Sequence, residues 1–415
     1  MAKEKGVIND NAEILKLENC ISFRAAESDP LSDSITVNGS TFWKKNNCIY
    51  NKFFEEMYHN FRGKDNYISL KEFEKIIIDL FFEIRRNPNV PHSIQAEMLK
   101  KPLLNGHALL PIYNVSVSDD IIHIGVFTVV KYQAIEKYLS ENGYLIPDNV
   151  AGDMSSDSYF NNIPFVDIPV LMRDPQFGLE SAKRIETVFI NFLNYVIYSN
   201  IKGVEVIRDY TNAGNRNRHF IVSDQNFSMS INSTPVGLLY LDLSEAVDDL
   251  ISEDEGNHRL LDLVGKNNPE NELETRIINA VNWIGMAIAE KNHAIAFTQA
   301  IFAVECLLQY QQTGEPISKS IVASIGEEVA FLLGSDIESR KAWEKKFKSL
   351  YGIRSKISHG KSTDITVYEV LDAIDLAKRL VVEILTNPAF KNAKTIQMVN
   401  NHIEKMRYTY SAQEE

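Results

Sequence analysis

Roughly the last third of the chain has the hydrophobic spacing of α-helices, and this constrains the fold more than any other feature. Apolar residues recur at every third or fourth position in five stretches, 273–291, 294–311, 317–333, 335–358 and 364–386. Ser335 stands three residues before Glu338, a spacing that predicts a capping box at the start of the fourth helix. Amphipathic helices with short connections predict an antiparallel bundle over 273–390 and a helical tail over 391–415.

The first 243 residues mix helical and strand patterns. Helices are predicted at 48–61, 69–86 and 180–199, the second with a capping box formed by Ser69 and Glu72. Strands are predicted at 119–130, 203–209, 218–223 and 227–243, where β-branched and aromatic residues lie between Asn, Asp, Gly or Pro. The predicted fold class is therefore α+β, with a mixed α/β domain over 1–243 and an all-α bundle after it.

Composition changes between these two patterns, over residues 244–272. Six acidic residues gather in the first half of this segment, and the stretch GKNNPENE follows them. Like charges combined with Gly, Asn and Pro predict an acidic connector between domains. A chain of 415 residues is long enough for two domains.

Cysteine and histidine positions favour neither a metal site nor a disulfide scaffold. The three cysteines, Cys20, Cys48 and Cys306, form no C-x-x-C pair, and no two histidines stand four residues apart beside an acidic residue. The prediction is therefore no metal and no cofactor. Few cysteines, no secretory signal and no long apolar stretch predict a cytoplasmic protein without a membrane span.

Residues 340–361 concentrate positive charge in a chain whose net charge is −13. The segment holds eight basic residues against one acid, Glu344. Its candidate phosphate contacts are Lys345, Lys348, Lys356 and Lys361. Such a pattern indicates either a site for the backbone of RNA or a solvated helix face, and charge alone favours neither.

Arg354 and His359 are the candidate catalytic residues within this segment. Arg354 continues the apolar stripe of its helix, where a charge requires a partner or a function. His359 comes five residues later, and on a continuous helix the two side chains would diverge by about 140°. If Gly360 ends the helix in a left-handed turn, His359 lies at an exposed edge near Arg354. The alternative is an arginine paired with a carboxylate and a histidine that caps a helix.

The motif RSKISH, from Arg354 to His359, fits the R-x(4–6)-H signature of HEPN domains. Together with RIINAVNWIGMAIAEKN, FAVECLL and EEVAFLLG it resembles the ApeA-like HEPN subgroup of bacterial anti-phage abortive-infection proteins, over about 273–387. The resemblance implies a dimeric helical bundle and a metal-independent endoribonuclease whose Arg354 and His359 act on RNA. Glu305 matches an acidic position that the family often keeps, and Ser355 stands where many active members have Asn, Asp or His. Both are expected to support the site.

The residue types suit RNA cleavage by the RNA's own 2′-hydroxyl. Histidine titrates near neutral pH and can move protons, and arginine provides a permanent bidentate cation for the phosphoryl oxygens. The expected function is a homodimeric, cytoplasmic endoribonuclease for single-stranded RNA, acting as a toxin-like or antiviral abortive-infection effector. Its N-terminal domain would sense a phage-derived trigger or regulate activity. Two alternatives are a non-catalytic HEPN module that binds RNA, a nucleotide or a protein partner, and an unrelated interaction protein whose basic helix is only a surface.

Overall fold

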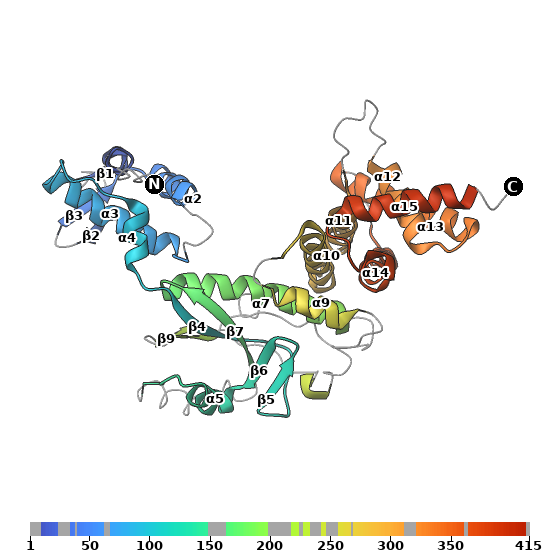
Figure 1. Cartoon of the computed structure of the whole chain (residues 1–415), viewed down its shortest axis with the longest axis horizontal. Helices are drawn as coiled ribbons and strands as arrows, with labels where there is room; N and C mark the ends of the chain where they lie inside the picture. The colour runs from blue at the N-terminus through green and yellow to red at the C-terminus, as the bar shows by residue number, and fades with distance from the viewer. Residues whose placement is uncertain are drawn as a thin grey trace, which may run out of the picture. The chain divides into compact units, whose positions relative to one another are not determined.

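The computed structural model describes residues 10–23, 34–37, 40–61, 67–147, 163–197, 217–223, 227–232, 242–245, 256–266, 269–310, 321–360 and 364–411. The chain divides into two compact units that alternate along the sequence. Unit 1 comprises 1–108, 169–182 and 220–228, and unit 2 comprises 109–168, 183–219 and 229–415. The protein is thus a mixed α/β chain with a C-terminal helical region (Figure 1).

Unit 1 begins with a small antiparallel sheet and four helices. The elements are α1 (Asn11–Leu15), η1 (Lys16–Asn19), β1 (Ile21–Ser22), β2 (Ser34–Val37), β3 (Ser40–Lys44), α2 (Asn47–Phe61), α3 (Leu70–Arg86) and α4 (Ile94–Lys100). The strands pair in the order β1-β3-β2. Helices α2 and α3 confirm two predictions, and the Ser69 hydroxyl caps α3 by accepting a hydrogen bond from the Glu72 N–H at 3.2 Å. Phe73, Ile77 and Leu80 of α3 are buried in the core of this unit.

A second sheet has the strand order β5-β6-β7-β4-β8-β9. Its strands are β4 (Leu104–Pro111), β5 (Ile121–Ile124), β6 (Phe127–Lys131), β7 (Pro164–Met172), β8 (Asn217–Ser223) and β9 (Phe227–Asn232). Between β6 and β7 lie η2 (Tyr132–Ala134) and α5 (Ile135–Glu141), and α7 (Pro175–Ile197) follows β7. Strand β8 and helix α7 confirm predictions, and β9 confirms the start of the predicted 227–243, of which residues 233–241 lie outside the described residues. The predicted strand 203–209 lies outside the described residues.

The prediction of one strand over 119–130 is wrong, because this segment is a hairpin. β5 and β6 pair antiparallel, with Ile124 opposite Phe127. Gly125 occupies the first position of the two-residue turn with a φ of 58°, a left-handed conformation that glycine adopts at little cost. The central strands β4 and β7 escape pattern analysis because several consecutive residues in each are buried, which removes the alternation that identifies strands.

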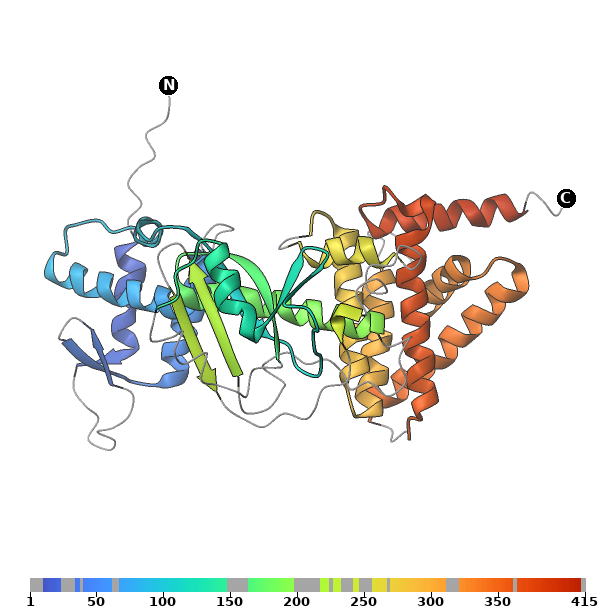
Figure 2. The same ribbon diagram turned by 90° about the horizontal axis from the view of Figure 1, so that it is seen from below.

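The C-terminal region consists of long helices at the predicted positions (Figures 1 and 2). They are α10 (Glu272–Ala289), α11 (His293–Leu308), α12 (Ile321–Leu333), α13 (Ile337–Ser358), α14 (Val367–Thr386), η4 (Pro388–Phe390) and α15 (Ile396–Ser411). Helix α10 packs against α11 and α14, and α12 packs against α13. The predicted cap at Ser335 is wrong. Asp336 caps α13 instead, because its carboxylate accepts the Ser339 N–H at 2.8 Å while the Ser339 hydroxyl accepts the Asp336 N–H.

Part of the predicted acidic connector is an integral helix, α9 (Asn257–Val264). Its side chains Leu260, Leu261, Leu263 and Val264 are buried. The Arg259 guanidinium donates a hydrogen bond to the carbonyl of Leu385 at the end of α14, at 3.1 Å. The acidic residues 246–255 lie outside the described residues. This helix therefore buries its apolar side chains, and its Arg259 is hydrogen-bonded to α14 of the helical region.

Packing also joins α7 to the helical region, so the compact units do not follow the predicted boundary at 244–272. The Asn191 side chain of α7 donates a hydrogen bond to that of Asn282 in α10. The Lys378 ammonium of α14 donates to the Tyr195 carbonyl at 2.8 Å. A Cβ atom at Gly285 would overlap the backbone of Asn191, so the two helices approach closely only because this residue is glycine.

Gly285→Ala is therefore expected to destabilise the protein by about 1–3 kcal/mol, because the added methyl group must separate α7 from α10. The matched control is Gly352→Ala in α13, where an added Cβ has no neighbour within 4 Å among the described residues. That substitution should stabilise the helix by up to about 1 kcal/mol. Urea unfolding of both variants measures the difference. Equal stabilities would show that the α7–α10 contact tolerates a larger side chain.

Candidate functional site

Arg354 lies on the side of α13 that packs against the rest of the helical region. Leu350 and Phe347 are buried on the same side, one and two turns earlier respectively. The Arg354 Nη2 atom lies 3.3 Å from the Glu305 Oε2 atom of α11, and the two side chains are 24% and 13% exposed. Arg354 Nη1 also donates to the Ser358 hydroxyl at 3.4 Å. The ion pair supplies the partner that the position of Arg354 requires.

Two aromatic rings surround the Arg354 guanidinium. Its Cζ atom lies 5.2 Å from the ring centroid of Phe302 and 5.6 Å from that of Tyr351. Cation–π attraction of this kind holds a guanidinium plane in place while its edges remain able to donate hydrogen bonds. Sequence reasoning misses both aromatics. The signal that could have found them is spacing, because Tyr351 stands three residues before Arg354 and Phe302 three residues before Glu305.

Tyr351 also interacts with Glu305. Burial raises the pKa of the Tyr351 hydroxyl, and the charge of Glu305 and a hydrogen bond to its carboxylate raise that pKa further. The phenol therefore stays protonated at neutral pH and donates to Glu305. The carboxylate of Glu305 thus accepts a hydrogen bond from Arg354 and lies near the Tyr351 hydroxyl.

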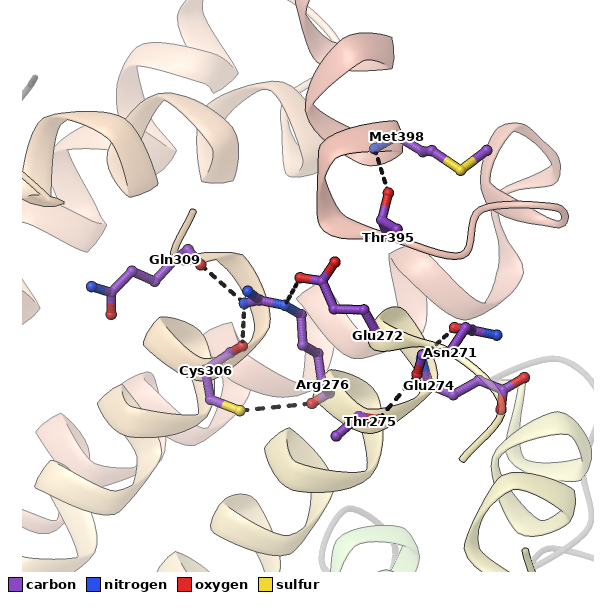
Figure 3. Close-up of polar contacts among 9 residues, drawn as sticks. All are labelled: Asn271, Glu272, Glu274, Thr275, Arg276, Cys306, Gln309, Thr395 and Met398. Carbon is purple, nitrogen blue, oxygen red and sulfur yellow. Dashed lines mark hydrogen bonds and ion pairs between the residues drawn. The ribbon is translucent and has the colours of Figure 1, made fainter. Parts of the chain in front are cut away.

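The end of α11 that carries Glu305 is held in place by Arg276 of α10 (Figure 3). The Arg276 Nη1 atom donates to the carbonyls of Cys306 at 2.9 Å and Gln309 at 3.0 Å, and its Nε atom donates to Glu272 at 2.8 Å. A cation at the C-terminus of a helix satisfies carbonyls that have no partner within the helix. Arg276 therefore positions the last turn of α11.

His359 follows the last helical residue of α13. Its backbone N–H donates to the Ser355 carbonyl at 3.1 Å, and that of Gly360 donates to the Ile357 carbonyl at 3.0 Å. Gly360 has a φ of 66°, which confirms the predicted left-handed turn. The His359 side chain is exposed and, within the described part of the chain, makes no hydrogen bond or ion pair.

Arg354 and His359 leave α13 in different directions. The helix continues through Ser358, so five residues rotate the second side chain by about 140° and raise it by about 7.5 Å. Arg354 points toward α11, whereas His359 lies on the exposed side that also carries Lys345 and Lys356. One chain therefore presents the two groups on different sides of the helix. Ser355, beside Arg354 in sequence, is partly exposed.

Much of the positive charge of α13 is neutralised by neighbouring acids. Ion pairs join Lys348 to Glu344 at 2.5 Å, Lys346 to Asp372 at 2.9 Å and Lys341 to Glu338 at 3.0 Å. Of the predicted phosphate contacts, Lys345 and Lys356 are exposed and make no ion pair with any described residue. Lys348 is paired, through an exposed interaction of the weak class. Lys361 lies outside the described residues.

A surface hollow of about 440 Å³ lies between α12 and the first turns of α13. Phe331, Arg340 and Lys341 line it, and neither Arg354 nor His359 does. In the part of the chain that the structure describes, no three His, Cys, Asp or Glu side chains gather as metal ligands. Among the same residues, no helix combines the length and apolarity needed to cross a bilayer.

Comparisons of this chain with protein-family models, with characterised proteins and with solved structures found no match.

Proposed function

We propose that the protein is a metal-independent endoribonuclease of the HEPN type that cuts single-stranded RNA. The observation that carries the proposal is the end of α13, where Glu305 fixes a partly exposed arginine and an exposed histidine follows five residues later. The resemblance of RSKISH to the HEPN signature supports the same reading. In this proposal the protein is a cytoplasmic, toxin-like or anti-phage abortive-infection effector, and its N-terminal α/β part senses a phage-derived trigger or regulates activity.

The proposed reaction is transesterification within the RNA. The 2′-oxygen attacks the adjacent phosphorus and loses its proton to a neutral His359, while the bond from phosphorus to the 5′-oxygen breaks. A protonated imidazole gives a proton to the departing oxygen, so the products are a 2′,3′-cyclic phosphate and a 5′-hydroxyl. Arg354 stabilises the charge that builds on the non-bridging oxygens. Glu305 keeps the guanidinium in position.

The divergence of Arg354 and His359 supports a site shared between two chains. A base and an acid are both needed, and each chain supplies one histidine in the motif. A two-fold axis beside α13 would bring His359 and Arg354 of both chains to one phosphate. Ile353 and Ile357, which flank Arg354 in sequence and are partly exposed, offer apolar surface for such a contact. The proposed active form is therefore a homodimer.

Purified protein is expected to cleave a single-stranded RNA oligonucleotide in the presence of EDTA and to leave a 2′,3′-cyclic phosphate. The matched control is the same sequence with 2′-O-methyl groups, which lacks the nucleophile and should stay intact, as should DNA. Gel electrophoresis and mass spectrometry of the products measure the outcome. Cleavage that requires Mg²⁺, or that proceeds on the methylated strand, would contradict the mechanism.

A second candidate function is a non-catalytic HEPN module that binds RNA, a nucleotide or a protein partner. The separation of Arg354 and His359 on one chain favours it if the protein is monomeric, and so does Ser355 in place of the residues common in active members. Such a module would bind RNA in EDTA without cutting it, so the same experiment distinguishes the two functions.

A further inference from the structure

Two partly exposed aromatic side chains, one on α10 and one on α11, lie side by side. The ring centroids of Trp283 and Phe302 are 5.4 Å apart, with their planes at 69°. Both side chains are partly exposed, while the buried sides of these helices consist of other residues, such as Ile284 of α10 and Ile301 of α11. Each ring is therefore partly packed and partly accessible to solvent.

The aromatic pair continues directly into the Arg354 site. Phe302 contacts Trp283 on one side, and its ring centroid lies 5.2 Å from the Arg354 Cζ atom. The Trp283 ring is therefore at most about 11 Å from that cation, the two separations taken end to end. Three helices contribute to this surface, α10 through Trp283, α11 through Phe302 and α13 through Arg354.

Arg354 is a group beside these rings that can bind a phosphate. Glu305 stands three residues after Phe302 on α11, and its charge is offset by the Arg354 guanidinium. Within the described part of the chain, Arg354 makes hydrogen bonds only to Glu305 and Ser358, which use part of its donor capacity. The guanidinium is thus held in place and can still donate to a phosphate.

We propose that Trp283 and Phe302 form a nucleobase-stacking platform and that Arg354 binds a phosphate of the same strand, so that the ligand is unpaired RNA. Aromatic side chains stack on bases that are not paired, and arginine binds the phosphate that connects them. Bases inside a duplex cannot reach such a platform. The inference rests on the proposed function, because it adds a base-binding surface to the RNA site proposed above.

The test uses the fluorescence of Trp283 in the full-length chain. The protein has three tryptophans, so Trp43→Phe and Trp343→Phe leave Trp283 as the single emitter, and His359→Ala prevents cleavage. Titration with a 12-nucleotide oligo(U) is expected to quench this emission to saturation, because a stacked base removes the excited state. A duplex RNA of the same length should quench it several-fold less at equal concentration.

Trp283→Leu in the otherwise native His359→Ala chain should weaken binding of the same labelled oligonucleotide about tenfold, measured by fluorescence anisotropy. Leucine keeps the apolar contact with Phe302 but cannot stack on a base. The matched control is Trp343→Leu in α13, a partly exposed tryptophan outside the platform, which should bind as tightly as the parent protein. Circular dichroism and thermal unfolding test whether both variants fold. If Trp283→Leu does not fold, Phe302→Leu replaces it as the platform variant.

Three outcomes would overturn the platform. These are unquenched Trp283 emission, equal affinity of the Trp283→Leu variant, or equal binding of duplex RNA. If Trp283 emission shifts to the blue as protein concentration rises, with or without RNA, this surface is an interface between two copies of the chain. Failure of the proposed function is seen separately. Quenching without cleavage by the native chain would contradict the proposed ribonuclease activity and support the platform. Cleavage by Trp283→Leu with an unchanged KM would contradict the platform and support the ribonuclease activity.

Discussion

His359→Ala is expected to lower the rate of RNA cleavage by at least about a hundredfold, because it removes the group that moves protons in the proposed reaction. Arg354→Ala should cause a loss of similar size, since the charge that develops on the phosphoryl oxygens loses its cation. Single-turnover cleavage of an RNA oligonucleotide in EDTA measures both rates. His359 is exposed and makes no described side-chain contact, so its replacement leaves the fold intact.

The matched control for the histidine is His258→Ala in α9, an exposed histidine whose only described ion-pair partner is Asp262, four residues later. This variant should cleave RNA like the native chain. Arg354→Ala leaves the partly buried Glu305 carboxylate without its cation, which can lower stability. Arg354→Lys is therefore the second variant. Lysine keeps the charge and loses the planar fork, so an intermediate rate is expected. Native rates in both His359→Ala and Arg354→Lys would contradict the proposed chemistry.

Glu328→Gln is expected to stabilise the folded protein increasingly between pH 4.5 and 8. Glu328 lies in α12 and is 6% exposed. Its Oε1 atom accepts from the Ser324 hydroxyl at 3.2 Å, while its Oε2 atom has no hydrogen-bond partner among the described residues. Burial raises the pKa of this carboxyl to about 8, and the nearby charge of Glu327 adds to that shift, against the opposing effects of Arg407 and Arg276.

The sign follows from proton binding. Between the ordinary pKa of 4.5 and the folded value near 8, the folded state holds a proton that the unfolded state has lost. Stability of the native chain therefore falls as pH rises through this window and is constant above it. Glutamine is neutral at every pH and avoids that loss, which at about 1.4 kcal/mol per pH unit reaches on the order of 5 kcal/mol.

Urea unfolding at pH 5, 7 and 8.5 measures the effect of Glu328→Gln. The matched control is Glu327→Gln, because the neighbouring carboxylate lies 2.6 Å from the Arg407 guanidinium and gains nothing from neutralisation. That variant should show no comparable stabilisation, because it loses the ion pair with Arg407. A Glu328→Gln difference that stays constant from pH 5 to 8.5 would show that this carboxyl is ionised in the folded protein.

Periodicity along the sequence determined most of the helical region. Helices α10 to α14 begin and end close to their predicted limits, and Gly360 ends α13 in the predicted turn. Both features are local, since a helix requires only apolar residues at regular spacing and a left-handed stop requires only a glycine. The sequence also identified Arg354 and His359 as unusual residues. Arg354 places a charge on an apolar stripe, and His359 directly precedes Gly360, which ends the helix.

Contacts between residues far apart in sequence decided the rest. Asp372 pairs with Lys346 and so reduces the charge of a segment that reads as strongly basic in isolation. Gly285 in α10 allows α7, from the α/β part of the sequence, to pack against the helical region. Glu305 and Phe302, about fifty residues before Arg354, fix its guanidinium. A local pattern shows which side of a helix is buried, whereas its partner depends on how separate segments pack, and only the tertiary structure determines that packing.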